Sequence, residues 1–176
     1  MEGRASRRRS EQPFELRKSR IHGRGAFATR RIRAGQRIVE YTGERISVEE
    51  GNRRYRDDTM KRHYTLLFTL NENAAIDGRR GGNDSRYINH SCDPNCEAVV
   101  EGDRIFIYAK KNIQPGLELT FDYQYERYDD DNESVERFYA CACGSAACRG
   151  TILKPKKKVR AKKKDRTKKA MRRDAV

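Results

Sequence analysis

The sequence predicts a mostly β domain with one helix and two basic ends. Stretches rich in β-branched and aromatic residues, separated by Gly, Pro, Asn and Asp, run through the middle of the chain. That pattern is typical of short strands joined by tight turns. With 176 residues, of which 35% are apolar, the chain is sized for one domain, and its low apolar share indicates that part of it lies outside the core.

The expected strands follow one another from residue 37. RIVEYTG (37–43) and HYTLLFTL (63–70) are the first two, and AAIDG (74–78) is a shorter third. AVVEGDRIFIYAKK (98–111) predicts two strands around a Glu-Gly-Asp turn, and NIQPGLELTFDY (112–123) predicts a Pro-Gly turn that leads into another strand.

One helix is predicted for residues 47–62, because Ser47 and Glu50 form a capping box and helical spacing continues after them. The segment ERYDDDNESVERF (126–138) is acidic and lacks strand periodicity, so we expect a mobile linker there. No stretch approaches the roughly 18 apolar residues of a membrane span, and the Arg-rich start lacks the apolar region of a secretory signal. We therefore expect no membrane association.

The net charge of +14 belongs to the two ends. Residues 154–176 carry +11 and residues 1–10 carry +3, which leaves residues 11–153 neutral overall. A basic run with so few apolar residues is predicted to be disordered in isolation. It is either a solubilising tail or a segment that binds nucleic acid or another polyanion, and its charge density favours binding.

The cysteines predict a metal site. Cys141, Cys143 and Cys148 form a C-x-C-x4-C arrangement, and a tetrahedral structural zinc needs a fourth ligand from elsewhere. Either Cys92 or Cys96 of NHSCDPNC can supply it. The alternative, cysteines packed as small apolar residues, is less favoured because the Gly-Ser-Ala sequence within the triplet forms a tight loop rather than a core segment.

A Gly-x-Gly sequence in HGRGAFA (22–28) allows the backbone to approach a ligand closely, although it is more often a simple turn. It has no third glycine and no helix after it. These absences exclude a dinucleotide-binding fold of the Rossmann type.

Five stretches in order, HGRGAFA, EYTGE, RYINHSCDPNC, ELTFDY and CACGSAACRGTIL, resemble the SET-domain protein-lysine methyltransferases with a post-SET zinc loop, of the compact stand-alone type. The resemblance implies small curved β-sheets around a pseudoknot, in which the NHSC and ELTFDY segments thread together. Arg24 stands where the family often has Trp, and Leu117 where it often has Glu. The implied parts are a basic disordered arm (1–13), a SET domain (14–125), an acidic linker (126–138), a post-SET zinc loop (139–153) and a disordered Lys/Arg-rich tail (154–176).

The resemblance also implies site residues. S-adenosylmethionine is expected against the backbone of Arg24, Gly25 and Ala26, with Tyr64, Arg86, Asn89 and His90 completing its cleft. Tyr123 matches the catalytic tyrosine, and Tyr41 and Phe121 match aromatic residues of the lysine channel. One structural zinc is expected on Cys92, Cys141, Cys143 and Cys148, with Cys96 free.

Without the resemblance, several of these residues have simpler readings. Tyr41, Tyr64 and Phe121 fall in strand patterns, where an aromatic side chain usually packs in the core. His90 by itself is more often a buried polar residue with satisfied hydrogen bonds than a catalyst.

The predicted function is S-adenosylmethionine-dependent methylation of lysine in histones or histone-like basic proteins, with the capacity for di- or trimethylation. The expected partners are a lysine-containing protein tail in the site and nucleic acid or a nucleosome on the basic tail, with the enzyme a monomer. The alternatives are a nucleic-acid-binding zinc protein with a vestigial methyltransferase site and a zinc-stabilised scaffold. The expected location is the cytoplasm or nucleoid of a bacterium, or the nucleus, since PKKKVR (155–160) looks like a nuclear import signal.

Overall fold

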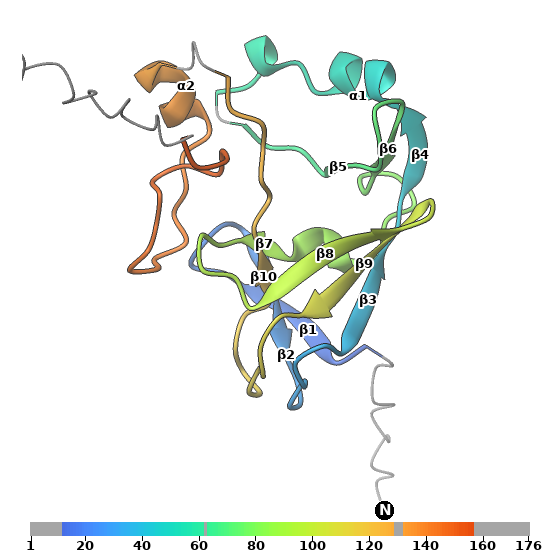
Figure 1. The fold of residues 1–176 in the computed structure, drawn as a ribbon, viewed down its shortest axis with the longest axis vertical. Coiled ribbons are helices and arrows are strands. Elements are labelled where there is room, and N and C mark those ends of the chain that lie inside the picture. Colours follow the sequence, from blue (N-terminus) through green and yellow to red (C-terminus); the bar gives the residue numbers. More distant parts are fainter. Residues whose placement is uncertain (1–11, 62, 129–131, 157–176) are drawn as a thin grey trace, which may run out of the picture.

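Four small β-sheets form the framework of the computed structural model, which describes residues 12–61, 63–128 and 132–156 (Figure 1). A hairpin pairs β1 with β2, two three-stranded sheets have the orders β3-β9-β8 and β4-β6-β5, and β7 pairs with β10 in parallel. The strands are β1 (Phe14–Lys18), β2 (Arg24–Ala28), β3 (Arg37–Tyr41), β4 (Glu44–Ser47), β5 (Leu67–Thr69), β6 (Ala74–Asp77), β7 (Asn89–His90), β8 (Cys96–Glu101), β9 (Arg104–Ala109) and β10 (Thr120–Phe121).

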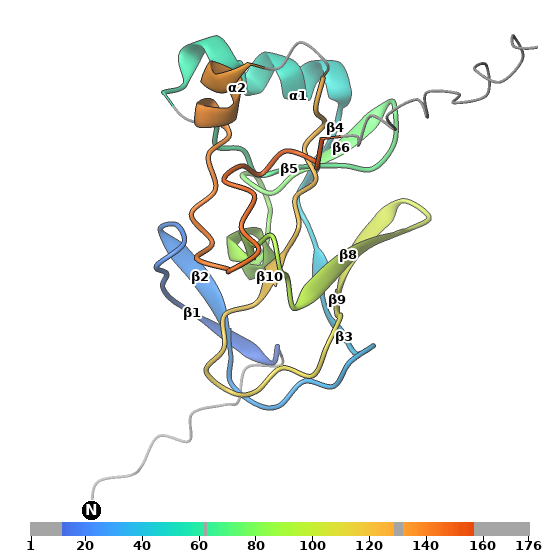
Figure 2. The ribbon, with the colours of Figure 1, turned by 60° about the vertical axis from the view of Figure 1, so that its left-hand side comes forward.

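Two short helices, α1 (Val48–Arg54) and α2 (Glu133–Phe138), lie together at one end of the molecule, and the β1–β2 hairpin lies at the other (Figures 1 and 2). Single 3-10 turns occupy Asp57–Thr59 and Asp84–Tyr87. No helix in the described part of the chain is long and apolar enough to cross a bilayer.

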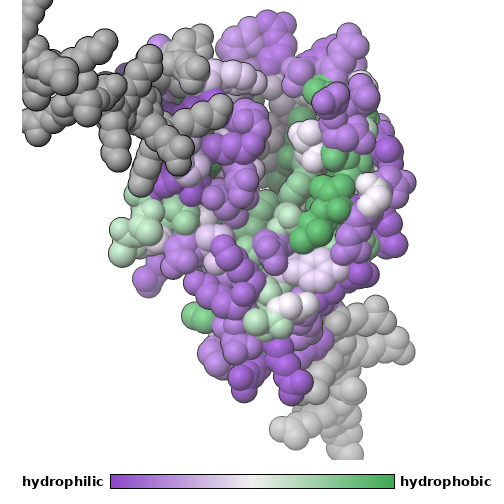
Figure 3. Space-filling model, viewed as in Figure 1, coloured by the Kyte–Doolittle hydropathy of each residue, from purple (hydrophilic) through white to green (hydrophobic). Residues whose placement is uncertain are grey.

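The core consists of two apolar clusters joined by β9. Ile107 of β9 packs in the larger cluster with Phe14 and Leu119, whereas Ile105 packs in the smaller one with Tyr41. Outside this core the surface is largely polar, with apolar side chains gathered in the middle of one face (Figure 3). The β3-β9-β8 sheet therefore contributes to both clusters through β9.

The mostly β fold with one main helix is confirmed, but several element boundaries differ from those predicted. β1, β2 and β4 were not predicted, because short strands rich in charged residues lack a clear alternation of apolar and polar positions. The predicted strand 63–70 is reduced to Leu67–Thr69, and the strand predicted within 112–123 is reduced to Thr120–Phe121. The residues left out of these strands form pocket walls and bridges to other segments.

The predicted helix 47–62 is also too long. Its start is right, since the Ser47 hydroxyl accepts a hydrogen bond from the Glu50 N–H at 3.0 Å. The helix ends at Arg54 because tertiary contacts replace its next turn: the Tyr55 hydroxyl donates to Asp77 at 2.7 Å, and Arg54 pairs with the same carboxylate at 3.0 Å.

The segment 126–138 contains α2, so its prediction as a mobile linker is wrong for the residues that the structure describes. Asn132 caps the helix by accepting hydrogen bonds from the N–H groups of Ser134 and Val135. Arg127 donates to Glu136 at 2.7 Å. The acidic composition hid this helix, because the cap and the tertiary contacts that hold it involve polar side chains. Residues 129–131 lie outside the described residues.

We expect the buried face of β9 to carry much of the stability. Ile107→Ala should lower the free energy of unfolding by about 2 to 5 kcal/mol, because it leaves a cavity in a fully buried site. Val100→Ala on the neighbouring β8, at a side chain that is 43% exposed, is the matched control and should cost about 0.5 kcal/mol. Urea denaturation followed by circular dichroism measures both, and equal losses would show that the assigned core is incorrect.

Candidate active site and cysteine cluster

The parallel pairing of β7 with β10 brings together two segments about 30 residues apart. Thr120 pairs with Asn89, and Phe121 pairs with His90. The Ser91 N–H donates to the Phe121 carbonyl at 3.1 Å, which extends the pairing by a residue. His90 and Tyr123 therefore lie together in the fold although they are far apart in the sequence.

Asn89 fixes the loop after β1 against this junction. Its side-chain amide lies 3.0 Å from the Arg24 carbonyl and 2.8 Å from Glu118 Oε1, and it also reaches the His22 carbonyl at 3.2 Å. Gly25 allows this arrangement, because a Cβ on Gly25 would lie only 2.2 Å from Glu118 Oε1. Gly25 therefore leaves the space that the Glu118 carboxylate occupies.

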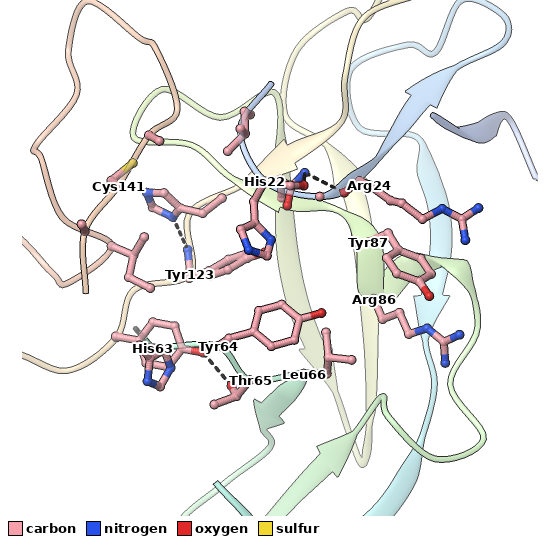
Figure 4. Close-up of a pocket in the computed structure, with 18 residues that line it drawn as sticks. His22, Arg24, His63, Tyr64, Thr65, Leu66, Arg86, Tyr87, Tyr123 and Cys141 are labelled. Carbon is pink, nitrogen blue, oxygen red and sulfur yellow. Dashed lines mark hydrogen bonds between the residues drawn. The ribbon is translucent and has the colours of Figure 1, made fainter. Parts of the chain in front are cut away.

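An inner cavity of about 130 Å³ opens beside this junction (Figure 4). It brings together six of the residues predicted to bind the cofactor or act in catalysis: Arg24, Tyr64, Arg86, Asn89, His90 and Tyr123. Gly25 and Ala26 do not line it. The Ala26 side chain is fully buried in the core, and His22 and Gly23 line the cavity beside Arg24; the expected contact of the cofactor with the backbone of residues 24–26 stays a prediction. The other lining residues are Ile21, His63, Thr65, Leu66, Tyr87, Tyr125, Ala140, Cys141, Ala142 and Ile152.

A second and larger concavity, the groove, has a volume of about 730 Å³ and contains both Tyr41 and Phe121. The groove and the inner cavity share part of their walls: His63, Thr65, Leu66, Arg86, Tyr123 and Tyr125 line both. Tyr123 therefore stands between two concave spaces. A group in one space and a group in the other can meet only beside these shared residues.

Tyr123 is held at both its backbone and its hydroxyl. Its N–H donates to His90 Nδ1 at 3.1 Å, and its hydroxyl donates to the Ile88 carbonyl at 3.0 Å. Burial raises the pKa of Tyr123 well above its ordinary value, so the side chain is a neutral phenol. It can orient a polar group but does not act as a phenolate base.

Tyr41 has the same character at the floor of the groove. Its hydroxyl donates to the Leu66 carbonyl at 2.6 Å, and burial raises its pKa well above the ordinary value. Gly78 makes room for this ring, because a Cβ there would approach the Tyr41 hydroxyl to 2.6 Å. Phe121 packs 4.9 Å from the Tyr123 ring and 5.8 Å from Phe68, and it belongs to the core as well as to the groove wall.

His90 links the Tyr123 backbone to a cysteine. Burial is the main reason that the pKa of His90 is lowered to about 4, and nearby Arg149 adds to it while Asp122 opposes it. The ring is therefore neutral near pH 7. Since Nδ1 accepts from Tyr123, Nε2 carries the proton and faces Cys92 Sγ at 3.4 Å. The imidazole connects the two sites without carrying charge.

The four cysteines predicted as ligands lie in one cluster, with their sulfur atoms within 4.8 Å of one another. Cys92 and Cys141 are 3.8 Å apart, which is close to the roughly 3.8 Å between sulfurs bound tetrahedrally at 2.3 Å from zinc. Burial alone would raise the pKa of Cys143, but backbone N–H groups and neighbouring thiols outweigh it and lower the value to about 6. This donor set fits a tetrahedral thiophilic cation.

Cys96 is not part of the cluster. It begins β8, is fully buried in the core, and burial raises its pKa to about 12. Of the two cysteines that spacing alone left open as a fourth ligand, the fold brings Cys92 to the triplet and packs Cys96 as a small apolar residue.

An ion pair joins the cysteine loop to the residue before Tyr123. Arg149 makes two hydrogen bonds to Asp122, at 2.9 and 2.8 Å, and both side chains are about one-fifth exposed. The Arg149 N–H also lies 3.3 Å from Cys92 Sγ. Because the pair is bidentate and partly shielded, it is stronger than an ordinary surface ion pair. No motif in the sequence marks Asp122 or Arg149 as part of the site.

His63 is a further residue of the site that no motif in the sequence indicates. It stacks on Tyr139 with ring centroids 4.4 Å apart and meets Tyr125 edge-on at 4.5 Å. Burial lowers its pKa, and its buried Nε2 has no hydrogen-bond partner among the described residues. A neutral imidazole with a free nitrogen in a shared pocket wall is suited to contact a ligand. Strand-like composition in 63–70 concealed this role.

The fold and the paired concavities define a domain of the SET class. The SET-domain family model matches residues 23–124, and the chain belongs to this family. Of the post-SET region expected after it, the structure shows the clustered cysteines that a zinc loop requires.

Similar proteins are named histone-lysine N-methyltransferases. Two of them are described as H3 lysine-4 specific. The enzyme from Emericella nidulans is 38% identical to this chain over 152 residues, and the enzyme from Saccharomyces cerevisiae is 38% identical over 149 residues. Set2 of Drosophila melanogaster is 44% identical over 147 residues. These matches cover 82%, 81% and 80% of this chain but only 12%, 13% and 6% of the relatives, so the chain spans a small part of their length.

The cysteine cluster predicts metal content by residue. Purified protein should contain one zinc per chain, and Cys92→Ser, Cys141→Ser, Cys143→Ser or Cys148→Ser should each lower that content, because zinc loses one of four thiolates. Cys96→Ser is the matched control and should keep the metal. Inductively coupled plasma mass spectrometry gives the ratio. Full retention of zinc by the Cys92→Ser protein would refute the ligand set.

Proposed function

We propose that this chain is an S-adenosylmethionine-dependent protein-lysine N-methyltransferase. The observation that carries the proposal is the pair of concavities that share a wall at Tyr123. Such an arrangement admits a methyl donor from one side and a lysine side chain from the other. Membership of the SET-domain family and relatives named histone-lysine N-methyltransferases support it. A binding protein with a vestigial site is not favoured, since it has no need of the intact shared wall.

The inner cavity is suited to S-adenosylmethionine, which the SET family uses as its methyl donor. Arg24, Tyr64, Arg86, Asn89 and His90 would hold it, together with His63, whose free buried nitrogen offers a polar contact. When bound, the cofactor supplies an electrophilic methyl group on a positive sulfur.

The chain's own residues prepare the lysine. Free lysine has a pKa near 10.4, and only its neutral amine has a lone pair for attack. Tyr41, Phe121 and Tyr123 exclude water from the groove floor, which disfavours the ammonium form. Neutral tyrosine hydroxyls and nearby carbonyls then orient the nitrogen, so that catalysis depends mainly on positioning and desolvation. No carboxylate pair for acid–base chemistry is required.

The four clustered cysteines would hold a structural zinc. Bound there, it would tie Cys92 to the loop 139–153, and that loop contributes Ala140, Cys141, Ala142 and Ile152 to the inner cavity. The metal would thus stabilise one wall of the cofactor site rather than take part in the reaction. The described parts are consistent with a SET domain over residues 14–125 and a zinc loop over 139–153.

The proposed substrate is a histone or a histone-like basic protein. The groove lining carries both signs of charge, with Asp57 and Glu126 beside Arg56 and Arg86, so the support for this substrate comes from the relatives named histone-lysine N-methyltransferases. The names of the eukaryotic relatives favour the nucleus as the site of action over the bacterial cytoplasm or nucleoid. We further propose that the enzyme acts as a monomer.

Residue substitutions in the groove test the reaction. Incubated with core histones and labelled S-adenosylmethionine, the enzyme should form di- or trimethyl-lysine, because Phe121 leaves room for an amine that already carries a methyl group. Phe121→Tyr should shift the products toward monomethyl-lysine. The shift should be several-fold, since one hydrogen bond is worth about 1 kcal/mol net. Mass spectrometry of the histones measures the product ratio.

Tyr123→Phe is the companion variant, and it should lose most turnover while its circular dichroism and thermal midpoint stay near those of the unmodified enzyme. Only monomethyl-lysine from the unmodified enzyme, with cofactor in excess, contradicts the reading of Phe121. No transfer to any histone or basic protein contradicts the proposed function.

The basic residues 154–176 are proposed to bind nucleic acid. Only Lys154–Lys156 of this segment fall within the described residues, so the proposal rests on the +11 charge of the sequence. Ending the chain after residue 156 should weaken binding to duplex DNA and flatten its dependence on salt, because fewer phosphate counterions are released. Fluorescence anisotropy over a salt series measures both. Equal affinity at every salt concentration would rule out this role.

A further inference from the structure

The described chain ends at the rim of the groove. Leu153 bridges in parallel to Tyr125, and the Lys154 N–H donates to the Tyr125 carbonyl at 2.8 Å. Arg127 Nε donates to the Lys154 carbonyl at 2.8 Å. Tyr125 and Glu126 both line the groove, and Tyr125 also belongs to the wall shared with the inner cavity. The basic segment is therefore attached beside the proposed lysine site.

Ion pairs hold the described end of the chain beside the groove. The Lys154 ammonium pairs with the Glu126 carboxylate, and Lys156 Nζ lies 2.9 Å from Glu136 Oε1. Arg127 donates to the same Glu136 carboxylate. These pairs are exposed, so each contributes little free energy by itself. With Arg127, Lys154 and Lys156 against Glu126 and Glu136, the rim has no net negative charge, so these pairs support the point of attachment and not an attraction of the remaining tail.

Residues 157–176 have the composition of the proposed substrate. They carry seven lysines: Lys157, Lys158, Lys162, Lys163, Lys164, Lys168 and Lys169. Covalent geometry sets the maximum span of these 20 residues at about 66 Å, using roughly 3.3 Å per residue. A domain of this size has a radius of gyration of about 15 Å. Length therefore does not prevent a lysine of this segment from returning to the groove.

We propose that a lysine of residues 157–176 enters the groove of its own molecule and is methylated there. This proposal rests on the proposed function. The lone pair of the neutral Nζ forms a bond to the methyl carbon as the carbon–sulfur bond breaks. The electrons of that bond stay on sulfur, which leaves as a thioether, and a proton from the nitrogen passes to water. The methyl donor is the only co-reactant.

Attachment makes this reaction unimolecular. A segment tethered at the rim has an effective concentration on the order of millimolar, so it competes with external lysines at ordinary substrate concentrations. Unmodified tail lysines therefore act as an internal substrate and as a competitor for histone. Methylation of the tail, or its capture by another partner, changes that competition.

Intact-mass and peptide-mapping measurements on the full chain test the proposal. With isotopically labelled S-adenosylmethionine and no added substrate, label should appear on one or more of the seven lysines. Its first-order rate constant should stay unchanged over an about tenfold dilution, as expected of a tethered reaction. A variant with all seven lysines changed to arginine keeps the charge and should incorporate no label there. A rate constant that falls in proportion to concentration would overturn the proposal in favour of transfer between two copies.

Peptide binding without cofactor gives a second measurement. A peptide with one lysine and no other charged group should bind the seven-fold Lys→Arg variant several-fold more tightly than the unmodified chain, because the competing tail lysines are gone. Equal dissociation constants would overturn the proposal. Methylation of added histone with no label on the tail would also overturn it and leave the proposed function standing. If neither the tail nor added histone receives a methyl group, the proposed function and this inference are refuted together.

Discussion

The parallel pairing of β7 with β10 is the constraint on which the rest of the structure depends. It unites segments from different parts of the sequence in one two-residue ladder. Around it, Asn89 reaches three acceptors, and Asn95 bonds the Glu118 carbonyl and the Thr120 N–H through its side chain. A two-residue ladder has few backbone hydrogen bonds of its own. The side-chain amides of Asn89 and Asn95 supply further hydrogen bonds that hold the junction together. The position of Tyr123 follows from this junction.

Burial around the same junction explains why three titratable side chains of the candidate site carry no charge. The hydroxyls of Tyr41 and Tyr123 and the His90 ring are all kept neutral by burial, and each has a hydrogen-bond partner. A reaction that starts from a neutral amine and a positive sulfur benefits from a dry site with fixed dipoles. It does not require an ionised side chain at the point of transfer.

The cysteine loop and the sheet domain contact each other beside this site. The bidentate Arg149–Asp122 pair, the Arg149 N–H near Cys92 Sγ and the His90 imidazole connect the cysteine cluster with the backbone of Tyr123. These contacts thus fix the position of the cysteine loop relative to the sheet domain. A change in the loop would alter the cofactor cavity wall and the setting of Tyr123 together. α1 and the β4-β6-β5 sheet, tied to each other by the Arg54–Asp77 pair, meet the site on the groove side, where Phe68 stacks on Phe121.

The sequence by itself determined the mostly β class, the start of α1 at Ser47 and the cysteines that gather, because turn chemistry, capping and ligand spacing are local. Motif resemblance also singled out Tyr123, five further residues that line the inner cavity, and Cys92 over Cys96 as the fourth ligand, which spacing alone left open. Only the tertiary structure decided that the Ala26 side chain packs in the core and that His63, Asp122 and Arg149 belong to the site. Those outcomes depend on which distant segments pair, and neither periodicity nor propensity encodes long-range pairing.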